Sequence, residues 1–126
     1  MKHLVLGICV LSVLLLIALL AANCLNQTAQ QLTSLLNRAC QLAEEDTLLQ
    51  ADQLAQQAQA IWENKRGLVA SLVDHARMDE IDQDFADLES WQRVAFREEY
   101  VQTCRSLARK IQSLADAEKA WYYNFL

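Results

Sequence analysis

The 126-residue chain contains no proline and only two glycines, Gly7 and Gly67. Hairpins and β-sandwiches need turn residues at short intervals, and glycine is the residue that most easily takes the positive φ angles of many such turns. A chain with so few turn residues favours long helices instead. The sequence therefore predicts an all-α protein, and its 53% content of hydrophobic residues excludes a disordered chain.

The longest apolar segment covers residues 4–22 and carries no charged side chain. A run of about 20 apolar residues is long enough to cross the hydrocarbon core of a bilayer as a helix. We expect an uncleaved transmembrane helix, preceded by a short cytoplasmic amino terminus (residues 1–3) and followed by an extracytoplasmic domain (residues 23–126). Two alternatives stay open: a cleaved signal peptide, and a lipoprotein signal that is cut before Cys24.

The charges that flank this segment indicate its orientation. Lys2 precedes the segment, whereas no Lys or Arg follows it before Arg38. Because basic flanks stay in the cytoplasm, we expect a single-pass protein of the cell membrane with its carboxyl-terminal domain outside. That domain has ten basic and sixteen acidic residues, a net charge of −6. An acidic domain is repelled by phosphate backbones, so nucleic acid is not an expected partner.

After residue 22, apolar residues recur every three or four positions, which is the spacing of one helix face. The first stretch continues the membrane helix outward. Each apolar stripe is narrow, so the helices must bury one another, and we expect an antiparallel hairpin or bundle of three or four helices. The second stripe has Trp62 and Val69 at its edge. The four stripes comprise Leu25, Ala29, Leu32, Leu36, Ala39 and Ala43; Ala51, Leu54, Ala58, Ile61, Leu68 and Leu72; Met78, Ile81, Phe85, Leu88 and Trp91; and Val101, Cys104, Leu107 or Ala108, Ile111 and Leu114.

The segments between these stretches predict where helices begin and end. The polar sequence 44–47 interrupts the first stretch, and Asp46 or Thr47 is placed to cap the next helix with its side chain. The second stretch runs to about residues 74–75. By contrast, residues 94–96 contain no turn residue, so the third and fourth stretches could form one helix. The interruptions at 44–47 and near His75 disfavour a coiled-coil division scaffold, which needs an unbroken heptad pattern.

The residues that could carry chemistry do not form an enzyme-like pattern. His75 and Asp79 are four positions apart, but one histidine does not supply a usual zinc ligand set, so His75 is better explained by its place near a helix end. The acidic run 79–89 has helical spacing and lacks the glycine of a calcium loop, so it is expected to be a solvated helix face. No nucleophile elbow or glycine-rich phosphate loop is present. We therefore expect no enzyme activity, metal or cofactor.

Cysteines and aromatic residues supply the remaining candidates. Cys40 and Cys104 both lie on or beside apolar stripes of the outer domain, where oxidation is permitted. Either a disulfide between them or two buried free thiols fits this placement. The aromatic carboxyl terminus could pack on the bundle, bind a partner, or lie at the membrane interface. Its residues are Trp121, Tyr122, Tyr123, Asn124 and Phe125.

Short motifs add a family resemblance to this layout. They are Trp62 in an amphipathic helix, Leu72-Val73-Asp74-His75 leading to Glu80-Ile81, and the closing Asn124-Phe125-Leu126. Over nearly its whole length the chain resembles an uncharacterised bacterial family, domain of unknown function 4363. The resemblance implies a short single-pass protein with a helical extracytoplasmic part, and it brings no known activity. The resemblance makes Trp62, Asp74 and His75 candidates for a structural role at the turn between helices.

These observations favour a structural or adaptor interaction module of the bacterial cell envelope. Its expected partner is another envelope protein, and self-association stays open. The main alternative is a ligand-sensing or regulatory bundle with a small pocket between helices near His75 and Trp62.

Overall fold

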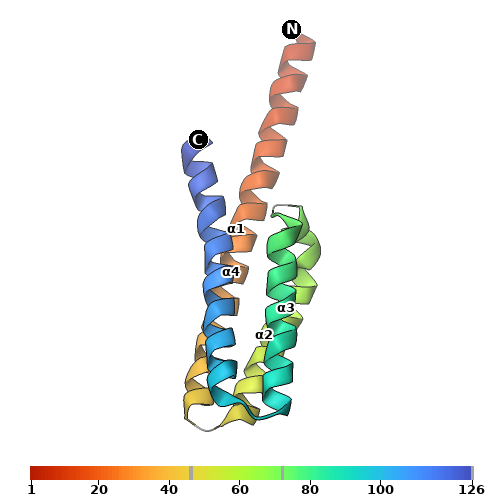
Figure 1. The fold of residues 1–126 in the computed structure, drawn as a ribbon. Coiled ribbons are helices and arrows are strands. Elements are labelled where there is room, and N and C mark those ends of the chain that lie inside the picture. Colours follow the sequence, from red (N-terminus) through yellow and green to blue (C-terminus); the bar gives the residue numbers. More distant parts are fainter. Residues whose placement is uncertain (46, 72, 126) are drawn as a thin grey trace.

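A computed structural model describes the backbone of residues 1–45, 47–71 and 73–125, and the side chains of these ranges as far as residue 117. Every element in these ranges is a helix: α1 (Lys2–Glu44), α2 (Leu48–Ala70), α3 (His75–Arg93) and α4 (Arg97–Phe125). Successive helices run antiparallel (Figure 1), and both α1 and α3 pack against α2 and α4. The predicted all-α bundle is confirmed.

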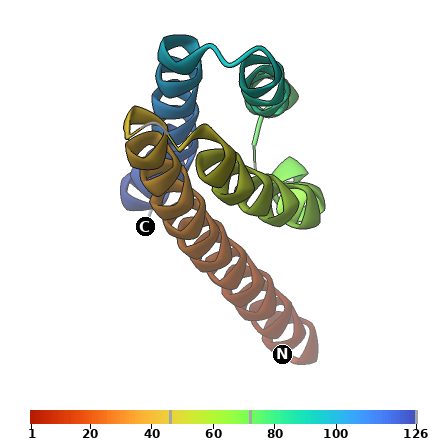
Figure 2. The same cartoon turned by 90° about the horizontal axis from the view of Figure 1, so that it is seen from below.

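Helix α1 is a single helix of 43 residues that lies in two different surroundings. Its amino-terminal half projects beyond α2 and α3, and its first turns also extend past the end of α4 (Figures 1 and 2). Side chains such as Leu6, Leu14 and Leu20 are exposed there. This segment is long and apolar enough to cross a membrane, a test that a signal sequence also passes. The second half buries the predicted stripe, which consists of Leu25, Ala29, Leu32, Leu36, Ala39 and Ala43.

The buried face of α2 is rotated slightly from the predicted one. Trp62 and Val69, which the sequence places at the edge of the stripe, are each 1% exposed and lie at its centre. The physical reason is that α2 packs against α3 as well as α1, so the side of α2 that faces α3 is also buried. On that side, Asp82 of α3 accepts the indole N–H of Trp62. The larger residues expected at the centre are only half-buried, namely Leu54, Ile61 and Leu68, and Leu72 lies outside the described residues.

Thr47 precedes α2 as predicted, but its side chain does not cap that helix. Its hydroxyl donates instead to the carbonyl oxygen of Leu42 in α1 (2.7 Å), and its backbone N–H donates to the same oxygen (3.1 Å). The last carbonyls of a helix lack partners within it, so Thr47 closes the end of α1. The predicted cap at Asp46 falls outside the described residues.

Helices α3 and α4 are separate, so the prediction that one helix could span them is wrong. Ala95 has a φ of 57°, and the N–H groups of Ala95 and Phe96 donate to the carbonyls of Gln92 (3.2 Å) and Trp91 (3.0 Å). This is the Schellman pattern, which ends a helix at a left-handed residue that is usually glycine. The stacked rings of Trp91 and Phe96, 5.9 Å apart, supply its apolar contact. Two aromatic residues five positions apart, Trp91 and Phe96, were therefore the sequence signal for the end of α3.

Candidate interaction surface

A polar cluster around Asp82 joins α2 to α3; we call Trp62, Arg66 and Asp82 the Asp82 cluster. One carboxylate oxygen accepts the indole N–H of Trp62 (2.7 Å), and the other accepts two N–H groups of Arg66 (3.1 and 2.7 Å). Burial raises the pKa of Asp82, but the hydrogen bonds from Arg66 and Trp62 and the Arg66 charge outweigh it, so this pKa lies below its ordinary value. Three donors thus satisfy one half-buried carboxylate between α2 and α3.

The turn before α3 contains Asp74 and His75. Asp74 is the N-cap of α3, and its carboxylate accepts the backbone N–H of Ala76 (3.3 Å), one of the free donors of the first turn. His75 is the exposed first residue of α3. The expectation that the second helix runs to this histidine is wrong, because α2 already ends at Ala70.

His75 and Trp62 therefore lie at different levels of the bundle. Trp62 meets α3 at Asp82, seven residues or about two turns beyond His75. Trp62 is also buried in the core, whereas His75 faces solvent. The structure does not bring these two side chains into one pocket, which was the basis of the ligand-sensing alternative.

The acidic run on α3 is not fully solvated, contrary to the prediction. Asp84 is buried, and its Oδ2 lies 2.9 Å from Nζ of Lys110 on α4. It follows Ile81 by three positions and precedes Leu88 by four, so it shares their inward face. A buried carboxylate needs a charged or hydrogen-bonding partner, and the sequence alone does not pair it with Lys110. Within the described residues, no group of three or more His, Cys, Asp and Glu side chains could hold a metal ion.

A second buried carboxylate, Asp52, joins α2 to α4. It accepts hydrogen bonds from the hydroxyl of Tyr100 (3.4 Å) and the amide of Gln56 (3.0 Å). Burial raises the pKa of Asp52, and the two hydrogen bonds oppose that rise only in part. Burial also raises the pKa of Tyr100. Neither residue stands out in the sequence, because their spacing follows the ordinary pattern of two amphipathic helices.

Cys40 and Cys104 meet where α1 packs on α4. Both are buried free thiols. The Cys104 thiol donates to the carbonyl of Leu36 in α1 (3.1 Å), and the Cys40 thiol lies 3.7 Å from the carbonyl of Val101 in α4. The contact between the thiols lowers the pKa of Cys40, and the Arg105 charge lowers it further against the effect of burial. The same contact and burial raise the pKa of Cys104.

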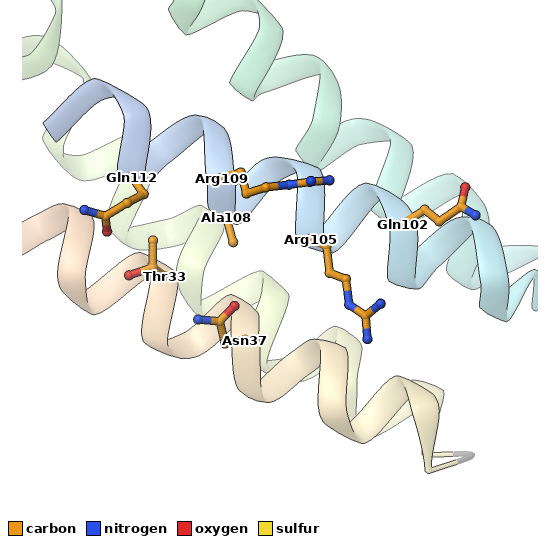
Figure 3. A pocket seen from close by; sticks show the side chains of 7 residues that line it. All are labelled: Thr33, Asn37, Gln102, Arg105, Ala108, Arg109 and Gln112. Carbon is orange, nitrogen blue, oxygen red and sulfur yellow. The ribbon is translucent and has the colours of Figure 1, made fainter. Parts of the chain in front are cut away.

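An open groove of about 810 Å³ runs between the same two helices. In Figure 3, Thr33 and Asn37 on α1 face Arg105, Ala108 and Gln112 on α4. The small side chain of Ala108 leaves room between the helices. We call this site the α1–α4 groove; its lining consists of Thr33, Asn37, Gln102, Arg105, Ala108, Arg109 and Gln112.

The α1–α4 groove is a positively charged site on an acidic domain. Its lining contains two guanidinium groups, three side-chain amides and a hydroxyl, and no carboxylate among the described residues. Arg105 pairs with Glu44 beyond the groove, whereas Arg109 pairs with no carboxylate in the part of the chain that the structure describes. Thr33 already donates its hydroxyl to the Ala29 carbonyl (2.8 Å), and Gln112 donates its amide to Asp116 (3.1 Å). The donors left for an anionic group are therefore the guanidinium groups and the amides of Asn37 and Gln102. The groove was not predicted from the sequence, because its residues come from two helices far apart in the chain.

The aromatic carboxyl terminus is the remaining candidate. The backbone of α4 continues to Phe125 and ends on the same side of the bundle as the projecting half of α1 (Figure 1). The side chains of the predicted site residues lie outside the described ones; these are Trp121, Tyr122, Tyr123, Asn124 and Phe125.

Comparison with known families matches the chain to the Domain of unknown function (DUF4363) over residues 19–124. The chain belongs to this family. The match covers the bundle and begins in the last turn of the apolar segment, so the resemblance drawn from the sequence is confirmed. No curated protein and no solved structure matched the chain. Membership in DUF4363 carries no activity, and a role must be inferred from the residues of the groove and the bundle.

Proposed function

We propose that this DUF4363 protein is a single-pass membrane protein whose bundle lies outside the cytoplasm as a structural or adaptor module of the bacterial cell envelope. We further propose that its α1–α4 groove binds an acidic segment of another envelope protein. One observation carries the proposal: an open groove with two guanidinium groups and no carboxylate among its described lining residues, on a domain with a net charge of −6.

The projecting half of α1 supports the membrane location. Its large apolar side chains, from Leu4 to Leu20, are each 44–69% exposed on all sides of the helix. Apolar surface of this extent is unfavourable in water and favourable in a bilayer. Lys2, before the segment, favours a cytoplasmic amino terminus. Because α1 is continuous, the bundle would be held close to the membrane surface.

The groove supports a binding role rather than a catalytic one. Its side chains are hydrogen-bond donors without an adjacent nucleophile and base, which is the arrangement expected for recognising carboxylates. Arg105 is held by Glu44 on α1, whereas Arg109 is available to an incoming acidic group. Charge complementarity of this kind steers association and selects partners.

Site-specific photo-crosslinking in membranes tests the groove. A photoreactive residue replaces Gln112 in the groove or, as a matched control, Gln57 on the exposed side of α2. We expect position 112 to crosslink one defined envelope protein through an Asp- or Glu-rich segment, and position 57 to give no such product. Products only between two copies of this chain, or equal products at both positions, would refute the adaptor role.

Labelling of an exposed cysteine tests the topology separately. Gln57→Cys is introduced into a chain in which Cys9→Ala and Cys24→Ser leave only the two buried native thiols. We expect a membrane-impermeant maleimide to label this variant in intact cells well above the parent without Gln57→Cys. Labelling that requires permeabilised cells would place the bundle in the cytoplasm.

A further inference from the structure

The two thiols at the α1–α4 interface are placed reciprocally. Cys104 donates to the carbonyl of Leu36, one turn before Cys40, and Cys40 lies beside the carbonyl of Val101, one turn before Cys104. Each sulfur therefore reaches across the interface at the level of the other cysteine. The two thiols are also close enough for each to shift the pKa of the other.

We infer that Cys40 and Cys104 are an oxidation site that forms an intramolecular disulfide between α1 and α4. The two helices already pack along this interface, so the bond would join elements that are neighbours in the fold. It would join the helix that carries the apolar segment to the last helix of the bundle. It would also fix the separation of the two helices beside the α1–α4 groove, because Arg105 lines that groove and its charge acts on Cys40.

The chemistry is a thiol–disulfide exchange with an external disulfide R–S–S–R, either a small-molecule disulfide or that of an oxidoreductase. The Cys40 thiolate attacks one sulfur of R–S–S–R, which gives a mixed disulfide and releases one R–S⁻. The Cys104 thiolate then attacks the Cys40 sulfur of that mixed disulfide and releases the second R–S⁻. The two cysteine protons end on the departing thiolates, and two electrons pass from the cysteine pair to R–S–S–R.

Cys40 is the better attacking group of the pair. It retains 5% exposure, whereas Cys104 has none. The neighbouring thiol and the Arg105 charge also favour the thiolate of Cys40, and the thiolate is the reactive form. Oxidation in cells rests on the proposed extracytoplasmic location, since thiols in the cytoplasm are kept reduced. Formation of the bond in the purified protein does not depend on that location.

The test uses the full chain in detergent micelles, with Cys9→Ala and Cys24→Ser to leave a single pair. The protein is equilibrated with reduced and oxidised glutathione, both native and in concentrated guanidinium chloride, then alkylated and digested with trypsin without reduction. The disulfide appears as a link between peptides 39–65 and 98–105. We expect its equilibrium constant to be about 30-fold higher in the native than in the denatured state.

The result that would overturn the inference is an equilibrium constant in the native state at or below the denatured one, or crosslinks only between chains. Cys40→Ala and Cys104→Ala are the matched controls, and each should abolish the linked peptide pair. The native-to-denatured ratio is measured on the intact pair, so it remains decisive if either variant fails to fold. A pair that forms in micelles but is reduced in cells would refute the proposed location and leave the disulfide site standing.

Discussion

The α2–α3 side and the α1–α4 side of the bundle differ in how their polar side chains are paired. Between α2 and α3, the carboxylate of Asp82 is satisfied by the indole of Trp62 and the guanidinium of Arg66. Between α1 and α4, Arg109 and the amides around it face an open groove. A satisfied cluster stabilises the fold, whereas donors left facing solvent are available to a partner. The same chain thus has one side whose polar groups are paired within the fold and another whose polar groups are open to a partner.

Truncating Trp62 should have the largest effect on stability. Trp62→Ala removes a fully buried indole from the α2–α3 side, and we expect the free energy of unfolding to fall by about 4 kcal/mol. Chemical unfolding followed by circular dichroism in detergent measures the loss. Trp91→Ala is the control, since Trp91 is only half-buried, and should cost about 1 kcal/mol. Equal losses for the two variants would contradict the role given to the Asp82 cluster.

Removing the charge of the Asp82 cluster should cost less. Asp82→Asn keeps an oxygen that can accept from Trp62 but loses the charged pairing with Arg66. Because the Asp82 side chain is 37% exposed, we expect a loss of only about 1 kcal/mol in the free energy of unfolding. Asp79→Asn is the matched control, because Asp79 is 76% exposed and lies 3.7 Å from the same guanidinium. A loss of stability for Asp79→Asn as large as that for Asp82→Asn would contradict the claim that Asp82 is the main partner of Arg66.

The pH dependence should distinguish Asp82 from Asp52. The pKa of Asp82 is lowered, so its contribution to stability is present above its unfolded value, near 3.8, and is lost as the pH falls through the folded pKa. The pKa of Asp52 is raised, so the contribution of Asp52 to stability is full below its unfolded pKa, near 3.8. That contribution is lost as the pH rises through the folded pKa.

These two signs predict opposite trends for two variants. As the pH rises from about 3 to about 7, Asp82→Asn should become more destabilising relative to the parent, while Asp52→Asn should become less so. Unfolding curves at a series of pH values measure both. Parallel trends would show that the two carboxylates sit in similar electrostatic surroundings.

A substitution in the turn between α3 and α4 should change the free energy of unfolding least. Ala95 has a left-handed φ of 57°, which costs a residue with a Cβ atom more than it costs glycine. Ala95→Gly should therefore raise the free energy of unfolding by about 0.5–1 kcal/mol. The exposed Ala86 in the middle of α3 is the control, and Ala86→Gly should lower the free energy of unfolding by about 1 kcal/mol. A loss at both positions would contradict the Schellman ending of α3.

Periodicity predicted the helices better than their contacts. The stripe of α1 from Leu25 to Ala43 followed directly from spacing, because a narrow apolar face on a helix can only be buried toward its neighbours. Spacing does not say which neighbour lies opposite, so the inward turn of Trp62 and the pairing of Asp84 with Lys110 were missed. The break at Ala95 was missed because a left-handed alanine replaces the expected glycine.

The site was less predictable than the fold. Cys40 and Cys104 were recognised because cysteines on apolar stripes are few, but their distance depends on how α1 packs on α4. The α1–α4 groove depends on the same packing, and Arg105 and Arg109 read in sequence as ordinary polar positions on the back of a helix. Membership in DUF4363 adds no ligand.

Binding of a partner by the α1–α4 groove can be tested with one charge reversal in the groove. Arg109→Glu is compared with Arg77→Glu, an exposed arginine on α3, for crosslinking from position 112 in membranes and for the unfolding transition. We expect Arg109→Glu to reduce the crosslinked partner about fivefold or more with an unchanged unfolding midpoint, and Arg77→Glu to change neither. Undiminished crosslinking in Arg109→Glu, or a loss matched by unfolding, would contradict the assignment of the α1–α4 groove as the binding surface.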